Sequence, residues 1–278
     1  AQACIAVLTP EHFYLIDSAV GSTDNVNLLR LPTARLDGLL LTHFHSDHIA
    51  EIYEVNLGSW VNGRPAPLTV FGPRGVGDVV EGINASYRQD RSYRVGHHGE
   101  VLLAPALVVL DHKTIEPGVI LDDGQLKITA YVGEHPPIEP AVGYRFDYRG
   151  RSVVISGDSN VSDSTRQITE GADLLLHDAL SLPTLTALSA ALGAAGQTRL
   201  AKIVTDVTDY HASTESLVEL GKQSNVGMIG YYHLAPVPAN PIIKAVFMRG
   251  ALENFVLTED LMWFELPIDS DEIIVHRP

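Results

Sequence analysis

A short segment of this chain is crowded with imidazole and carboxylate side chains, Thr42-His43-Phe44-His45-Ser46-Asp47-His48, and restricts the possible folds more than any other part of the sequence. It directly follows the apolar run 36–41, which predicts a buried strand. Donors of this kind at the carboxyl end of a strand can project toward two neighbouring points and hold metal ions there. The alternative is a histidine-rich surface turn, which does not require so many metal-ligating residue types within six positions.

The remaining pattern predicts an α/β protein. Apolar runs with strand character and helical stretches alternate along the chain, and no linker or repeat interrupts them. The expected strands are 4–7, 13–17, 36–41, 68–71, 125–132, 174–176, 226–232 and 143–156, the last interrupted by a turn at 148–151. The expected helices are 47–57, the stretch that ends near 87, 211–223 and 242–252. We predict a single domain over residues 1–278 with two similar α/β halves.

Composition restricts the partners. Lys plus Arg number 19 and Asp plus Glu 34, a formal net charge of −15, so we do not expect nucleic acid as a partner. No run approaches the roughly 20 apolar residues of a membrane span, so we expect no membrane role. Cys4 is the only cysteine and excludes an intrachain disulfide. We expect a soluble protein, cytoplasmic or periplasmic after cleavage of a leader absent from this sequence, that could form a homodimer.

The segment 43–48 resembles the His-x-His-x-Asp-His signature of the metallo-β-lactamase superfamily, and further motifs of that family follow in order. His135 resembles its next histidine, Asp158 its metal-bridging aspartate and His233 its last ligand. The resemblance implies a four-layer αββα sandwich. It also implies two metal ions, one held by three histidines and one by a second set, with Asp158 touching both. The implied sets are His43, His45 and His135, and then Asp47, His48 and His233.

Two further motifs resemble the ribonuclease Z and arylsulfatase-like branch of that family. By this resemblance His211, in Tyr-His-Ala-Ser, is the expected general acid, and His177 and Asp178, in Leu-His-Asp-Ala, support it; Asp47 joins them among the expected catalytic residues. The alternative for His211 is a structural position at a helix N-terminus. We also expect Asp17, at a strand end, to bond the far nitrogen of a ligand histidine.

The resemblance implies hydrolysis of small esters by a hydroxide that bridges two divalent ions. Phosphodiesters and aryl sulfates are the substrates expected before any other. Zinc is the expected metal, although this ligand set also suits iron, manganese and nickel. The alternatives are a lactonase, a ribonuclease Z-type endonuclease, an iron-containing redox member and a non-catalytic binding protein. Ribonuclease Z enzymes that process transfer RNA precursors carry a long arm between the third histidine and the bridging aspartate, where this chain has only residues 136–157. His97, His98 and His112 match no metal motif, and a solvated loop is the expected setting of the first two.

Overall fold

The computed structural model describes residues 3–278, which form two compact units that meet in sequence between Glu116 and Pro117. The division falls between two α/β segments, where the sequence pattern predicts the two halves. The single domain predicted for residues 1–278 stays a prediction, and each unit is described by itself.

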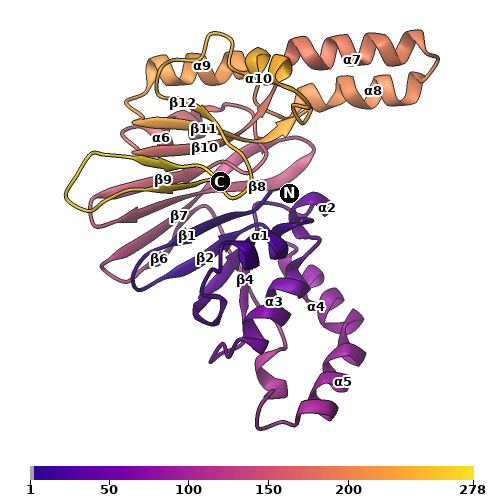
Figure 1. Ribbon diagram of the computed structural model, residues 1–278, viewed down its shortest axis with the longest axis vertical. Coiled ribbons are helices and arrows are strands. Elements are labelled where there is room, and N and C mark those ends of the chain that lie inside the picture. Colours follow the sequence, from indigo (N-terminus) through magenta and orange to yellow (C-terminus); the bar gives the residue numbers. More distant parts are fainter. Residues whose placement is uncertain (1–2) are drawn as a thin grey trace. The chain divides into compact units, whose positions relative to one another are not determined.

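The first unit is built on a five-stranded sheet (Figure 1). The outermost pair is an antiparallel hairpin, and each later strand pairs in parallel with its neighbour. The second and third strands are buried at every position, which explains their uninterrupted apolar sequences. In order across the sheet, the strands are β1 (Ile5–Leu8), β2 (Phe13–Ile16), β3 (Gly38–Leu40), β4 (Thr69–Gly72) and β5 (Asp111–Thr114).

Helices follow the strands of this unit, and three of them contribute buried residues to its core, Val26 of the first helix among them. Ile52 and Val80 pack with Leu39 and Val70 of the sheet in one buried apolar cluster. The helical elements are α1 (Ser22–Leu28), η1 (Thr33–Arg35), α2 (Ser46–Ile49), α3 (Ile52–Val61), α4 (Val76–Ser86), α5 (Arg88–His98) and η2 (Pro105–Leu107).

The helix predicted for residues 47–57 is divided into α2 and α3 at Glu51. The Glu51 N–H donates to the carbonyl of Ser18, 2.8 Å away, rather than within a continuous helix. Its carboxylate accepts from the backbone N–H groups of Gly21 (2.7 Å) and Thr23 (2.8 Å) at the start of α1. A tertiary contact therefore sets this break, and no local helix-stop signal marks it.

The second unit is built on a seven-stranded sheet with a separate two-stranded ribbon. Its antiparallel half contains the predicted hairpin, whose turn residues Arg149 and Gly150 both have positive φ (47° and 83°). The other half is parallel. In order across the sheet, the strands are β12 (Phe255–Leu257), β11 (Met228–Ala235), β10 (Leu174–Leu180), β9 (Arg151–Ile155), β8 (Ile138–Tyr148), β7 (Leu126–His135) and β6 (Gly118–Asp122); the ribbon is β13 (Trp263–Glu265) with β14 (Ile274–His276).

The helices of the second unit differ in their burial. Leu217 and Phe247 pack on Leu175 and Ile229 of the sheet, whereas α7 and α8 form a hairpin that projects from the unit (Figure 1). The helical elements are α6 (Asp163–Thr169), α7 (Leu182–Ala194), α8 (Thr198–Asp206), η3 (Val207–Asp209), α9 (Thr214–Gln223) and α10 (Pro241–Phe247). Among the described residues, no helix is both long and apolar enough to cross a membrane.

One edge of the second sheet gathers the carboxyl ends of several strands. β7 and β9 are both antiparallel to β8, so they run in the same direction as β10 and β11. The register of β10 and β11 shifts after Asp178, because Tyr232 and Leu234 pair with successive residues and His233 is left as the extra residue, with φ 45°. Such bulges redirect side chains and occur often beside functional sites.

Candidate metal centre and hydrolytic site

In the first unit, the predicted donors lie in the turn that leads from β3 into α2. His43 and His48 are buried, at 1% and 0% exposure, and His45 precedes the first residue of α2. Asp47 lies in the first turn of that helix. The strand ends at Leu40, so the whole cluster is at the strand's carboxyl end, as the sequence predicts.

Asp17, at the end of the neighbouring strand β2, fixes the orientation of two of these histidines. Its Oδ2 accepts from His48 Nδ1 (2.7 Å) and from the hydroxyl of Thr42 (2.8 Å), and its Oδ1 accepts from the Thr42 N–H (2.8 Å). Because the Thr42 hydroxyl donates to Asp17, it accepts from His43 Nδ1, 3.1 Å away. Both imidazoles therefore carry their proton on Nδ1 when neutral and a lone pair on Nε2. The hydrogen bond predicted for Asp17 is present.

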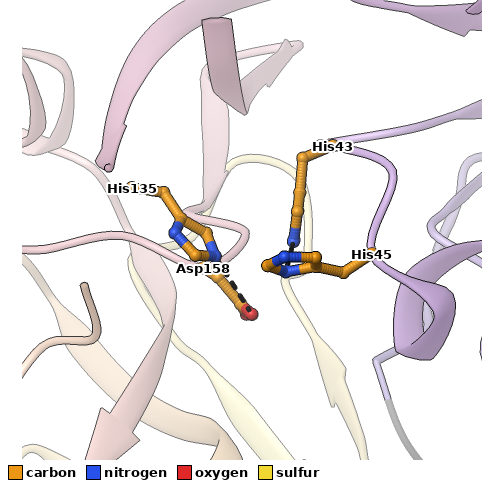
Figure 2. Close-up of side chains that lie close together, drawn as sticks. All are labelled: His43, His45, His135 and Asp158. Atoms are coloured by element: carbon orange, nitrogen blue, oxygen red, sulfur yellow. Dashed lines mark hydrogen bonds and ion pairs between the residues drawn. The ribbon is translucent and has the colours of Figure 1, made fainter. Parts of the chain in front are cut away.

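The two histidines of the signature turn face one another. His43 Nε2 lies 3.0 Å from His45 Nδ1, the contact marked by a dashed line in Figure 2. Since His43 Nε2 carries a lone pair, the two nitrogens must have a proton or a cation between them. This arrangement fits a metal ion that takes one nitrogen from each ring.

In the second unit, three histidines surround one buried carboxylate at the edge of the sheet. Asp158 Oδ1 lies 3.3 Å from His233 Nδ1, and its Oδ2 lies 3.9 Å from both His135 Nε2 and His211 Nε2; Figure 2 shows the His135 contact. Atoms 3.9 Å apart are too far for a hydrogen bond, and ligands of one ion have such spacing. One donor atom each from Asp158, His211 and His233 lie within 4.8 Å of one another.

Asp178 is a fully buried carboxylate with three hydrogen-bond donors and a fourth polar neighbour. Its Oδ1 accepts from the Ser159 N–H (3.2 Å) and lies 2.9 Å from His177 Nδ1, which hydrogen-bonds to the backbone carbonyl of Asp178 (2.9 Å). Its Oδ2 accepts from His211 Nδ1 (2.8 Å) and the Ala212 N–H (3.3 Å). The predicted support of His211 by Asp178 is therefore a direct hydrogen bond, whereas His177 reaches His211 only through Asp178.

The charges of this cluster shift two pKa values in opposite directions. Burial raises the pKa of Asp178, but the hydrogen bonds from His177 and His211 outweigh it and bring that pKa below its ordinary value. Burial lowers the pKa of His211, but the hydrogen bond to Asp178 and the charges of Asp178 and Asp158 bring it above its ordinary value. The protein therefore favours a charged carboxylate beside a protonated imidazole.

Tyr210 is a site residue that the sequence reading missed. Its ring stacks on that of His135, with centroids 4.8 Å apart and planes 12° from parallel. The signal was its position directly before His211, on the loop that also carries the proposed acid. The histidines without a motif lie elsewhere: His97 and His98 are exposed at the end of α5, a helix and not the expected loop, and His112 is exposed on β5.

The donors define the class of protein. Imidazole and carboxylate groups, without lysine or arginine among them, suit a divalent transition metal, and carboxylates hold their ring tautomers as in metal centres generally. A protonated histidine beside such donors can give a proton to a departing group. The fold and these donors together define an α/β metal-dependent hydrolase.

Comparison with known proteins gives the family. Residues 12–227 match the family model described as the beta-lactamase superfamily domain. The chain is 32% identical over 226 residues to a protein named ribonuclease Z from Mycobacterium bovis (strain BCG / Pasteur 1173P2), covering 80% of this chain and 76% of that relative. The chain therefore belongs to the beta-lactamase superfamily.

Solved structures agree on the fold. The metallo-beta-lactamase fold protein YhfI from Bacillus subtilis matches with a TM-score of 0.65 and 17% identity, over 94% of this chain and 90% of that one. Human tRNase Z, short form, matches with a TM-score of 0.63 and 17% identity, over 96% of this chain and 93% of that one. These likenesses confirm the predicted α/β fold of the metallo-β-lactamase type.

Proposed function

We propose that the donors of the two units act together and bind two divalent ions, and that zinc is the metal at both positions. The first unit supplies two buried histidines with fixed tautomers, and the second supplies a carboxylate among three imidazoles; each unit alone offers too few ligands for two ions. The family model covers residues 12–227, so it includes donors of both units, all but His233, which supports a shared site. The proposed ligands are His43, His45 and His135 for one ion, Asp47, His48 and His233 for the other, and Asp158 for both.

Ions bound there would supply a hydroxide near neutral pH and positive charge to stabilise the attacked group. The chain's own contribution is the proton for the leaving oxygen. His211 is held at Nδ1 by Asp178, so Nε2 is the atom that faces the reaction, 3.9 Å from Asp158. Its hydrogen bond to Asp178 and the charges of Asp178 and Asp158 outweigh burial and raise its pKa, which favours the protonated form that a general acid requires.

The reaction that this arrangement supports best is hydrolysis of small phosphodiesters. The observation that carries it is the buried Asp178–His211 pair beside Asp158, because an alkoxide that leaves a phosphodiester needs a proton. Aryl sulfates and lactones are the alternative substrates, and they are assayed together with the phosphodiesters. An aryl group such as 4-nitrophenol leaves without protonation, so it separates the acid's role from that of the metals.

The test compares two phosphodiesters, one with a 4-nitrophenyl leaving group and one with an alkyl leaving group, using zinc-loaded protein. We expect His211→Ala to lower kcat for the alkyl ester by about 10²–10⁴-fold and to affect the 4-nitrophenyl ester far less. An equal loss on both esters would contradict the role of His211 as the acid. Turnover of an aryl sulfate or a lactone, but of neither phosphodiester, would move the proposal to that substrate.

RNA is the second candidate substrate. It is favoured by the relatives named ribonuclease Z. Because of these relatives, we no longer expect from the net charge alone that nucleic acid is excluded as a partner. Cleavage of a transfer RNA precursor at its 3′ side, with the 4-nitrophenyl diester as the competing substrate, decides between the two. A specificity constant for the precursor at least a hundredfold higher would favour RNA.

A further inference from the structure

The hairpin of α7 and α8 connects Asp178 to His211, the hydrogen-bonded pair that includes the proposed general acid. α7 begins four residues after Asp178, and the chain returns from α8 through η3 to His211. The thirteen residues of α7 include no charged side chain, although 19% of the chain is charged. The hairpin nevertheless projects from the second unit (Figure 1), and although Leu185 is buried, Leu182 and Leu188 of α7 are 36% and 38% exposed.

The helix α8 has three distinct faces. One faces α7, because Ser189 Oγ lies 2.9 Å from Thr205 Oγ1 and donates to the Ala201 carbonyl. A second is polar and carries Arg199 and the ion pair of Lys202 with Asp206. Residues three and four apart share a face of a helix, so the third face is apolar and contains Leu200, Ile203 and Val207.

This apolar face is only partly covered and leads to the proposed site. Leu200 and Ile203 are 49% and 48% exposed. From Leu200 to Val207 the face extends about 10 Å along the helix, and Tyr210 follows at the same spacing. Tyr210 stacks on His135, and the next residue is His211. The apolar stripe, defined as Leu200, Ile203, Val207 and Tyr210, thus ends at the atoms proposed to react.

We propose that the apolar stripe binds an alkyl or aryl group of the substrate, so that this hydrolase prefers amphiphilic phosphodiesters. The inference rests on the proposed function. The stripe has no cation and so does not suit the backbone of a polyanion, whereas an apolar chain that covers Leu200 and Ile203 removes their exposed surface from water. Continuity with Tyr210 and His211 favours a substrate group over a second copy of the chain.

The experiment compares methyl 4-nitrophenyl phosphate with dodecyl 4-nitrophenyl phosphate, whose chain is long enough to reach Leu200, on zinc-loaded protein and below the concentration at which the dodecyl ester forms micelles. Each methylene removed from water contributes a factor of up to about four. Since the stripe is open on one side, we expect kcat/KM to favour the dodecyl ester by about tenfold. Equal kcat/KM values for two hydrolysed esters would overturn the stripe's role.

The variant Leu200→Ser/Ile203→Ser should reduce this preference to less than about twofold while keeping turnover of the methyl ester. Two matched controls should keep the tenfold preference: Leu188→Ser, which removes a leucine of similar exposure (38%) on α7, and Lys202→Ser on the polar face of α8. A preference that survives in the double variant, or is lost equally in the controls, contradicts the inference.

A binding measurement separates this inference from the proposed reaction. Calorimetry with methyl phosphate and dodecyl phosphate should show tighter binding of the dodecyl compound, lost in the double variant. Equal affinities would overturn the inference even if both esters are hydrolysed. Failure to hydrolyse either ester, with the dodecyl preference in binding intact, would instead refute the phosphodiesterase proposal. Sedimentation that shows a dimer for the wild type and a monomer for the double variant would make a second copy the occupant and overturn the inference.

Discussion

Asp178→Asn removes one charge at the centre of the hydrogen-bond network behind the proposed acid. One carboxylate oxygen accepts from the Ser159 N–H and lies beside His177 Nδ1, and the other accepts from His211 Nδ1 and from the Ala212 N–H. The NH2 group of asparagine must face one of these two pairs. The imidazole of that pair can change its tautomer and accept a hydrogen bond from the NH2 group. The backbone N–H of that pair can only donate, so it loses its acceptor.

The cost follows from this geometry. One buried N–H loses its acceptor, which costs about 1–3 kcal/mol, and the remaining bonds lose the strengthening that a charged acceptor provides. We expect Asp178→Asn to lower the free energy of unfolding by about 2–4 kcal/mol. The matched control Asp163→Asn, at an exposed position in the first turn of α6, should change it by about 0.5 kcal/mol or less.

Urea unfolding of both variants at several pH values measures the effect. The pKa of Asp178 is below its ordinary value in the folded protein, so its contribution to stability is complete above the unfolded aspartate pKa of about 3.9. It is lost as the pH falls through the lower, folded pKa. The difference between wild type and Asp178→Asn should therefore be full at pH 7 and shrink below about pH 4. A difference under about 0.5 kcal/mol at pH 7 would show that the carboxylate of Asp178 does not hold this network together.

Three further results are expected. Asp17→Asn, which weakens the hold on His48 Nδ1, should lower zinc affinity about 10–100-fold in a chelator competition, and unchanged affinity would contradict the role of Asp17. For Glu51→Gln, burial raises the Glu51 pKa but the N–H groups of Thr23 and Gly21 lower it overall, so the variant should lose about 1 kcal/mol at pH 7. That loss should fade as the pH drops below about 4.3, and a loss that does not vary with pH would count against it. Burial raises the pKa of the Cys4 thiol to about 12. Its reaction with a thiol reagent at pH 8 should therefore be at least about a hundredfold slower than that of free cysteine, and it should accelerate on unfolding. An equally fast reaction in the folded protein would show the thiol to be accessible.

The sequence predicted the parts of the fold that depend on local pattern. The apolar runs at β2 and β3 are fully buried strands, and the Arg149-Gly150 turn joins β8 to β9, because periodicity and turn chemistry are local properties. The dense signature from His43 to His48 likewise locates donors at a strand end without knowledge of tertiary contacts.

What the sequence could not give depends on distant partners. Glu51 ends one helix and caps another through contacts thirty residues away, and Asp178 meets His211 across thirty-three residues. The hairpin of α7 and α8 is not among the predicted helices, because Pro183 and Gly193 in its sequence are residues that disfavour a helix interior. Pro183 instead lies in the first turn of α7, where its missing N–H costs nothing, and Gly193 is tolerated near the end of the helix.

We propose that donors from both units bind metal for one hydrolytic reaction. Elemental analysis of protein purified without added metal, together with hydrolysis of bis(4-nitrophenyl) phosphate, tests this on wild type, His48→Ala and Asp158→Ala. We expect about two zinc ions per chain for the wild type, and loss of metal and of turnover in each variant, although one residue belongs to the first unit and the other to the second. Absence of metal in the wild type, or full turnover by either variant, would show that the two groups of donors do not form one site.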